Sequence, residues 1–287
     1  FVSPTNIKNV LMDASIYGVA AMAMTIAIIT GAFDLSLSAN FAWAQIFFCF
    51  LLNTWGDTAG GILLAFVCTL LSTMAIGAIN GLVIVKGDIP AFIATMGMSY
   101  MIKGGCLVFT GGDMIATSNT FIAELGKGTF LGQSYLTYIF ILVAVVCHLF
   151  MKYTQAGRNF YATGGNIVSA KLAGIRSDRI KIIAYIICAM CCAVTGILLA
   201  SVMGAGTSSA CDAYMVNSFA AVYVGSATLK DGEFHIVGTL IGVLITTIAF
   251  NGLAILGIDT YAQYLFQGFI ILFSVALSSV ARKYAIK

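Results

Sequence analysis

The sequence predicts an all-α membrane protein with many spanning helices. Of its 287 residues, 60% are apolar and only 9% are charged, and the mean hydropathy is +1.01. Soluble domains are about 45–50% apolar and about 25% charged, because a soluble surface needs polar groups. The apolar stretches are continuous, whereas the strands of a membrane barrel would alternate apolar and polar residues. The composition therefore excludes a soluble enzyme, a nucleic-acid-binding protein and a disordered chain.

Nine segments are long and apolar enough to cross a bilayer, which takes about 20 residues. They are 10–30, 35–54, 61–85, 90–110, 135–152, 182–203, 213–229, 235–257 and 261–281. Two of them are weak. Segment 90–110 contains Lys103 and a glycine pair, and segment 213–229 is short and contains Asn217 and Ser218. Interrupted spans of this kind usually lie inside a bundle, where neighbouring helices satisfy their polar groups.

The basic residues indicate which side each loop faces, because cytoplasmic loops carry an excess of lysine and arginine. In the nine-span topology, eleven of the 14 basic residues fall on one side, including those from Lys152 to Lys181 and in the C-terminal tail. That side is predicted to be the cytoplasm, so the C-terminus is cytoplasmic. Nine spans then place Phe1 outside. One further span before Phe1 would start the chain inside and bring the total to ten.

Two stretches of the sequence match each other at an offset of 171 residues. Residues 78–97 and 249–268 share eight identities in twenty positions. The pairs are Ala78, Asn80, Gly81, Leu82, Ile84, Asp88, Ala91 and Gly97 with Ala249, Asn251, Gly252, Leu253, Ile255, Asp259, Ala262 and Gly268. The first copy leaves the membrane inside and the second leaves it outside, so the halves are predicted to be inverted repeats, a frequent plan in transporters. A common Asn-Gly-Leu helix end is the alternative, but the constant register argues against it.

The predicted cytoplasmic loop, about 153–181, is polar, basic and rich in glycine. Asn166 can cap a short amphipathic helix over Ile167–Ala173, since its side chain can accept from a free backbone N–H. Gly174 can end that helix in the left-handed conformation. A loop that only anchors the topology needs charge alone. The glycine-rich corners and the capped helix therefore favour close contact with a partner protein.

Three short motifs follow one another along this loop. They are Gly157-Arg158, Ala162-Thr163-Gly164-Gly165-Asn166 and Ala170-Lys171-Leu172-Ala173-Gly174-Ile175. In this order the loop resembles the ATPase-docking loop of bacterial ABC-importer permeases of the ribose type. Further matches to that family at 31–36, 90–95 and 236–242 extend the resemblance over nearly the whole chain from Asn6 onward.

The resemblance implies a permease subunit, with residues 1–287 as one transmembrane domain in the bacterial cytoplasmic (inner) membrane. Its implied partners are two ABC ATPase subunits, a second permease chain, an extracytoplasmic substrate-binding protein and membrane lipid. ATP hydrolysis would belong to the ATPase, and this chain has no phosphate-loop motif. No catalytic residue, metal, cofactor or nucleic-acid partner is expected. Ser38 and the loop 230–235 depart from the family pattern, which suggests pairing with a different permease chain, with a homodimer as the alternative.

The turn between the first two predicted spans contains a charged residue. Asp34 is expected to cap the helix that begins near Leu35, with Ser36 beside it. A gating role and ion coupling are the alternatives for Asp34. The spans offer few other ionisable groups, and an ion-driven cycle usually needs them. The residues therefore favour energy that arrives through a partner.

Polar side chains in the spans predict a neutral polar substrate, because hydroxyl and amide groups suit a sugar or a nucleoside. Asn40, Phe41 and Asn217 are candidates for the substrate path, although each residue could instead hold helices together. Close helix packing is expected at Gly77, Gly81, Gly238, Gly242 and Gly252. A sugar importer is the expected function. A branched-chain amino-acid or nucleoside ABC permease and an ion-coupled secondary transporter remain alternatives.

Overall fold

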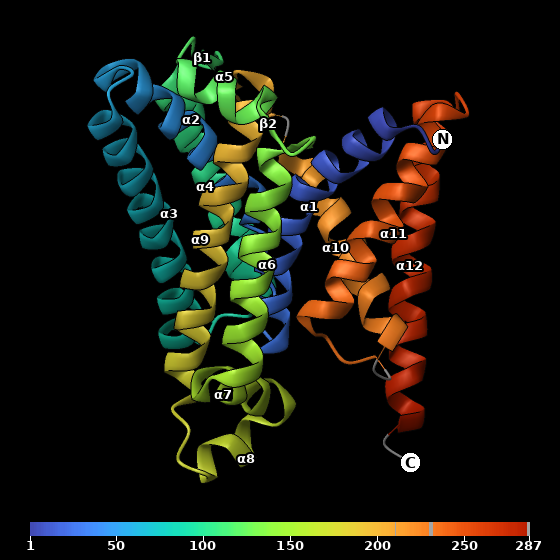
Figure 1. Ribbon diagram of the computed structural model, residues 1–287. Coiled ribbons are helices and arrows are strands. Elements are labelled where there is room, and N and C mark those ends of the chain that lie inside the picture. The colour runs from blue at the N-terminus through green and yellow to red at the C-terminus, as the bar shows by residue number, and fades with distance from the viewer. Residues whose placement is uncertain (210, 230–231, 286–287) are drawn as a thin grey trace.

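The computed structural model describes residues 1–209, 211–229 and 232–285, which are mostly helical (Figure 1). A long helix occupies each of the nine predicted spans. These helices are α1 (Pro4–Ile29), α2 (Leu37–Trp55), α3 (Ala59–Gly87), α4 (Ala91–Thr110), α6 (Tyr135–Tyr153), α9 (Ser177–Met203), α10 (Cys211–Leu229), α11 (Ile236–Ile255) and α12 (Thr260–Ala285). The predicted all-α class is confirmed.

Eight of these helices are long and apolar enough to cross a membrane. Within the described ranges, α10 does not reach that apolarity, because Asp212, Asn217 and Ser218 lower its mean hydropathy. The ninth predicted span is therefore a helix, but not one that composition marks as spanning. It packs against α1, α11 and α12, which are apolar neighbours able to shield its polar groups.

Short elements lie at the two ends of the bundle (Figure 1). Helices α7 (Gln155–Gly165) and α8 (Ile167–Leu172) follow α6 at one end. Helix α5 and two antiparallel strand pairs lie at the other end. Their bounds are α5 (Thr120–Lys127), β1 (Ile115–Ala116) paired with β4 (Ala205–Gly206), and β2 (Thr129–Phe130) paired with β3 (Gln133–Ser134).

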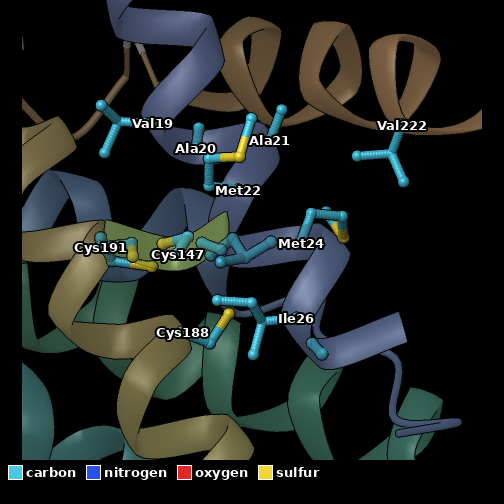
Figure 2. Close-up of a cluster of buried hydrophobic side chains, with 14 of the residues drawn as sticks. Val19, Ala20, Ala21, Met22, Met24, Ile26, Cys147, Cys188, Cys191 and Val222 are labelled. Carbon is cyan, nitrogen blue, oxygen red and sulfur yellow. The ribbon is translucent and has the colours of Figure 1, made fainter. Parts of the chain in front are cut away.

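The core lies around α1, α2 and α9. Their most apolar windows are 78%, 72% and 67% buried, whereas those of α3, α4 and α12 are 22%, 17% and 11% buried. The first three helices are therefore central, and the last three present their apolar side chains outward. Figure 2 shows α1 side chains packed beside Cys147, Cys188 and Cys191 from α6 and α9. These cysteines serve as small apolar groups in the core.

Four of the five predicted packing glycines lie at close helix contacts. A Cβ on Gly81 would lie 2.8 Å from the Ile182 Cα, so α3 and α9 touch there through their backbones. A Cβ on Gly242 would lie 1.9 Å from the Ala221 carbonyl oxygen of α10. Gly77 and Gly238 are equally crowded. The prediction is wrong for Gly252, where a Cβ would meet only the Phe1 ring, at 3.8 Å, because this part of α11 faces an open side.

The two copies of the internal repeat have the same local structure. Residues 78–97 cover the end of α3, a turn and the start of α4, and residues 249–268 cover the end of α11, a turn and the start of α12. Figure 1 shows the α3–α4 turn at the end that carries α7, and the α11–α12 turn at the opposite end. The copies are therefore inverted, as predicted.

Equivalent asparagines of the two copies each bond to the start of another helix. Asn80 Nδ2 donates to the Ser36 Oγ at 2.7 Å, at the start of α2. Asn251 and Asn6 donate to each other's Oδ1 at 3.1 and 2.9 Å, at the start of α1. Each repeat asparagine thus fixes the first turn of another helix.

Candidate functional site

The strongest candidate site is the pair of helices α7 and α8, which lies at the end of the bundle where α6 finishes (Figure 1). The sequence predicted residues 153–166 as a loop with glycine-rich corners, and this is wrong in detail, because Gln155–Gly165 form a helix. Thr154 caps it, with its Oγ1 accepting from the Gly157 N–H at 3.0 Å. The corner itself is one residue, Asn166, at φ −153° and ψ 106°.

Two glycines of α7 allow it to lie directly on the spanning helices. A Cβ on Gly157 would lie 2.3 Å from the Met151 carbonyl oxygen of α6. A Cβ on Gly164 would lie 1.7 Å from the Ile29 carbonyl oxygen at the end of α1. Gly165 differs, since a Cβ there would meet nothing within 4 Å. The first glycine of the Gly-Gly pair thus serves contact with α1, and the second lies open.

Helix α8 begins and ends as the sequence predicted, except that it is one residue shorter, Ile167–Leu172. The Asn166 Oδ1 accepts from the Val168 and Ser169 N–H groups, both at 3.0 Å. At the other end Gly174 has φ +80°, and the Ile175 N–H donates back to the Ala170 carbonyl at 3.0 Å. This is the Schellman ending, which needs a residue in the left-handed region.

The two faces of α8 differ in exposure. Ala170 is 4% exposed and faces the protein, whereas Val168 and Leu172 are 64% and 85% exposed. Val168 and Leu172 are four residues apart, so they share one outward helix face. Lys171 Nζ pairs with the Asp178 Oδ1 at 3.1 Å and ties α8 to the start of α9. The structure therefore presents a small apolar face at one end of the molecule.

The other motif residues of the loop lie around this face. Arg158, in the first turns of α7, is exposed, and Ala162 is half-buried. The Ala162 carbonyl accepts from the Asn166 N–H at 3.2 Å and closes the last turn of α7. The exposed Arg158, the Asn166 cap and the apolar face of α8 therefore lie within one compact unit.

The turn between α1 and α2 contacts three further helices. Its Leu35 N–H donates to the Thr95 Oγ1 of α4 at 3.1 Å, and its Phe33 carbonyl accepts from the Tyr185 hydroxyl of α9 at 3.1 Å. The Asn80 bond to Ser36 adds α3. Because Gly164 lies against the end of α1, this turn connects α7 to the centre of the bundle.

Asp34 does not cap α2 directly, contrary to the sequence prediction. The helix begins at Leu37, and its N-cap is Ser36. The Asp34 Oδ1 instead accepts from the Ser36 N–H at 2.8 Å and from the Ser36 Oγ at 2.6 Å. Burial raises the pKa of the Asp34 carboxyl, and the bonds from Ser36 oppose that rise. Asp34 thus holds the residue that precedes the helix.

The three substrate-path candidates lie on α2 and α10, two helices that contact each other. Asn40 and Phe41, on α2, are 2% and 0% exposed. The Asn40 Oδ1 is buried and has no hydrogen-bond partner among the described residues. Asn217, on α10, instead accepts a hydrogen bond from Gln267 of α12. Asn217 therefore belongs to a helix contact, while Asn40 keeps an unused acceptor inside the bundle.

Comparison with known proteins identifies the family. The sequence model described as branched-chain amino acid transport system / permease component matches residues 6–275. The chain belongs to this permease family. Ribose import permease protein RbsC of Escherichia coli strain K12 is 32% identical to the permease over 290 residues, covering 97% of this chain and 87% of RbsC.

Two further relatives extend the comparison. RbsC of Bacillus subtilis strain 168 is 34% identical to the permease over 279 residues, covering 96% of this chain and 85% of that protein. L-arabinose ABC transporter permease protein AraH of Azospirillum brasilense is 29% identical over 282 residues, covering 98% of this chain and 82% of AraH. No solved structure shows a significant match. The permease is thus a multi-pass membrane protein whose relatives are transport subunits rather than enzymes.

Sequence reasoning missed two residues of the permease's outward face, Val168 and Leu172. Both are apolar residues inside a polar, basic loop, and they are spaced by four within a segment already predicted as a helix. That spacing on a helix predicts one shared face. The signal was therefore present in the sequence.

Proposed function

We propose that the permease is the transmembrane subunit of an ATP-driven importer that moves a sugar into the cytoplasm by alternating access. The observation that carries the proposal is the α7–α8 unit, which lies directly on α1 and α6 and presents Val168 and Leu172 outward. An exposed apolar pair on a preformed, capped helix suits a protein partner, because a preformed surface lowers the ordering cost of binding. The names of the relatives, which are ribose and L-arabinose permeases, support a sugar as the substrate.

The partner at α8 would be an ABC ATPase subunit. Motion of α8 would pass to α7 through the Asn166 corner and from α7 to the Ile29 carbonyl through Gly164. The end of α1 leads into the Asp34–Ser36 turn, which contacts α3, α4 and α9. Because this route is made of backbone contacts and hydrogen bonds, a push on α8 would move helices rather than bend side chains. Opening of the pore would follow from that movement.

The remaining partners follow from the same arrangement. The end of the bundle with α7, α8 and the end of α12 would face the cytoplasm, and the end with α5 and the strands would face the substrate-binding protein (Figure 1). The mostly outward-facing α3, α4 and α12 leave apolar surface for lipid and for a second permease chain. The permease would lie in the bacterial inner membrane. Inside the bundle, the unused Asn40 Oδ1 could accept from a sugar hydroxyl.

The test of docking is the variant Leu172→Ser, measured as substrate uptake and ATP hydrolysis in proteoliposomes that contain all subunits. Uptake and substrate-stimulated hydrolysis should both fall, because the partner loses an apolar contact of about 2 kcal/mol. The matched control is Leu172→Met, which keeps an apolar side chain of similar volume at the same position and should keep coupling. Unchanged coupling in Leu172→Ser would refute docking at α8. Uptake that needs no ATPase but collapses with an ionophore would refute the importer.

A further inference from the structure

A charged cavity of about 670 Å³ opens beside the α7–α8 unit. Its walls come from the end of α6, from α7 and from the segment that enters α11. Two spanning helices therefore meet a surface helix around one hollow. This is the level at which the apolar part of α6 ends and its first cation, Lys152, appears.

Among the described residues, two cations line this cavity and neither has an ion-pair partner. Lys152 lies in the last turn of α6 and Arg158 in the first turns of α7, and both are exposed. In the part of the chain that the structure describes, the ion pairs are Lys103 with Asp212 and Lys171 with Asp178, so neither Lys152 nor Arg158 is neutralised. Lysine and arginine at such a place bind phosphate, arginine through a fork that matches two oxygens.

One carboxylate lines the same cavity from another wall. Glu233 precedes α11 and lies close enough to Tyr161 of α7 that its negative charge, after burial, raises the pKa of the Tyr161 hydroxyl. Tyr161 therefore remains a hydrogen-bond donor. Glu233 makes no ion pair with Lys152 or Arg158 within the described residues, so the opposite charges are held apart. His148 and His235 complete the polar lining.

The rest of the lining is apolar. Met151 and Ile236 are each 2% exposed and form a closed wall, while Val237 is 39% exposed. On α6, Leu149 continues the exposed apolar surface one turn deeper into the predicted span. A ligand of this cavity would thus contact separated positive and negative groups with its polar part and apolar side chains with the remainder.

We propose that this cavity binds the headgroup of a phospholipid that carries both a phosphate and a primary ammonium, as phosphatidylethanolamine does. Lys152 and Arg158 hold the phosphate, Tyr161 donates a hydrogen bond to it, and Glu233 accepts from the ammonium. Basic pockets between helix ends at a membrane surface bind phospholipid headgroups. Glu233 adds selectivity, because it repels a headgroup with no positive charge and forms no N–H hydrogen bond with a trimethylated one.

The bound lipid would join two parts of the fold that the chain connects only distantly. Its phosphate would rest on α6 and α7, and its ammonium would rest on the segment before α11. The ligand would therefore act as a bridge between the docking unit and the second repeat. This inference does not depend on which sugar is carried or on ATPase docking.

Native mass spectrometry of the full-length permease, purified with its copurifying subunits, tests the proposal. The probes are phosphatidylethanolamine, phosphatidylcholine and phosphatidylglycerol with identical acyl chains, and inorganic phosphate. Phosphatidylethanolamine should be retained most tightly. Lys152→Gln and Arg158→Gln should each weaken its retention about fivefold, and the double variant about 25-fold. Lys86→Gln is the matched control, since Lys86 lies exposed in the last turn of α3, away from the cavity, and it should change nothing.

Glu233→Gln tests selectivity separately. This variant should lose the preference for phosphatidylethanolamine over phosphatidylglycerol while it keeps affinity for the shared phosphate. Thermal unfolding with added lipid gives a second readout: phosphatidylethanolamine should stabilise the wild type and not the double variant. Equal retention of all three lipids, tighter binding of phosphatidylglycerol by the wild type, or saturation by inorganic phosphate alone would each overturn the proposal.

Discussion

Gly164→Ala is the most direct test of the contact between α7 and α1. The new Cβ would lie 1.7 Å from the Ile29 carbonyl oxygen, and real Cβ contacts essentially never fall below 3.0 Å. The difference, 3.0 − 1.7 = 1.3 Å, is the least that α7 must move. The obstacle is backbone, which cannot rotate away as a side chain can. Overpacking of this kind typically costs about 1–3 kcal/mol.

Gly165→Ala is the matched control at the next position. A Cβ there meets nothing within 4 Å, and alanine in a helix is favoured over glycine by about 0.5–1 kcal/mol. We therefore expect Gly164→Ala to lower the melting temperature and Gly165→Ala to leave it equal or higher.

The functional assay is uptake per ATP hydrolysed in proteoliposomes that contain the whole transporter. Gly164→Ala should reduce that ratio, because a shift of α7 by more than 1 Å misplaces the link to α1. Gly165→Ala should keep the wild-type ratio. Equal behaviour of the two variants, in either assay, would refute the claim that this contact transmits motion.

Two further predictions concern the cap of α8 and the buried carboxylate. Asn166→Ala removes an acceptor of two N–H groups, so α8 should lose about 1 kcal/mol of local stability, measured as faster hydrogen exchange at the Val168 and Ser169 amides; unchanged exchange would contradict the cap. Folding raises the pKa of Asp34, so the folded protein binds the proton more tightly than the unfolded chain, and stability should rise as pH falls through that raised pKa. Asp34→Asn keeps an acceptor for Ser36 and should remove this pH dependence while uptake continues; loss of uptake with intact folding would favour ion coupling at Asp34.

The sequence predicted the spans well because the signal there is simple. Long apolar runs have few alternative structures in a bilayer, so the helix positions follow from hydropathy alone. α10 is instructive, because Asn217 and Ser218 weakened its signal and yet a helix forms at the predicted place. Its neighbours α1, α11 and α12 provide the packing that the hydropathy of its own residues does not predict.

The docking unit was predicted less completely. Asn166 and Gly174 have local roles, a cap and a left-handed ending, and such roles can be inferred from residue type and spacing. Helix α7 could not be inferred in the same way, because its glycines are poor helix formers and its stability comes from contacts with α1 and α6. Likewise, Asp34 is displaced from the cap position by Ser36, whose hydroxyl also bonds to Asn80 of α3. A hydrogen-bond partner 44 residues away in the chain cannot be predicted from the residues around Ser36.

The different roles of Asn80 and Asn251 bear on how the two halves of the chain are held together. Each asparagine occupies the same repeat position and anchors the first turn of a different helix, at Ser36 and at Asn6. Ser36 lies in the same half of the chain as Asn80, so the first bond joins helices within one half. Asn6 and Asn251 lie in opposite halves, so the second pair of bonds joins the two halves to each other. One repeat position therefore serves packing inside the first half and cohesion between the two halves.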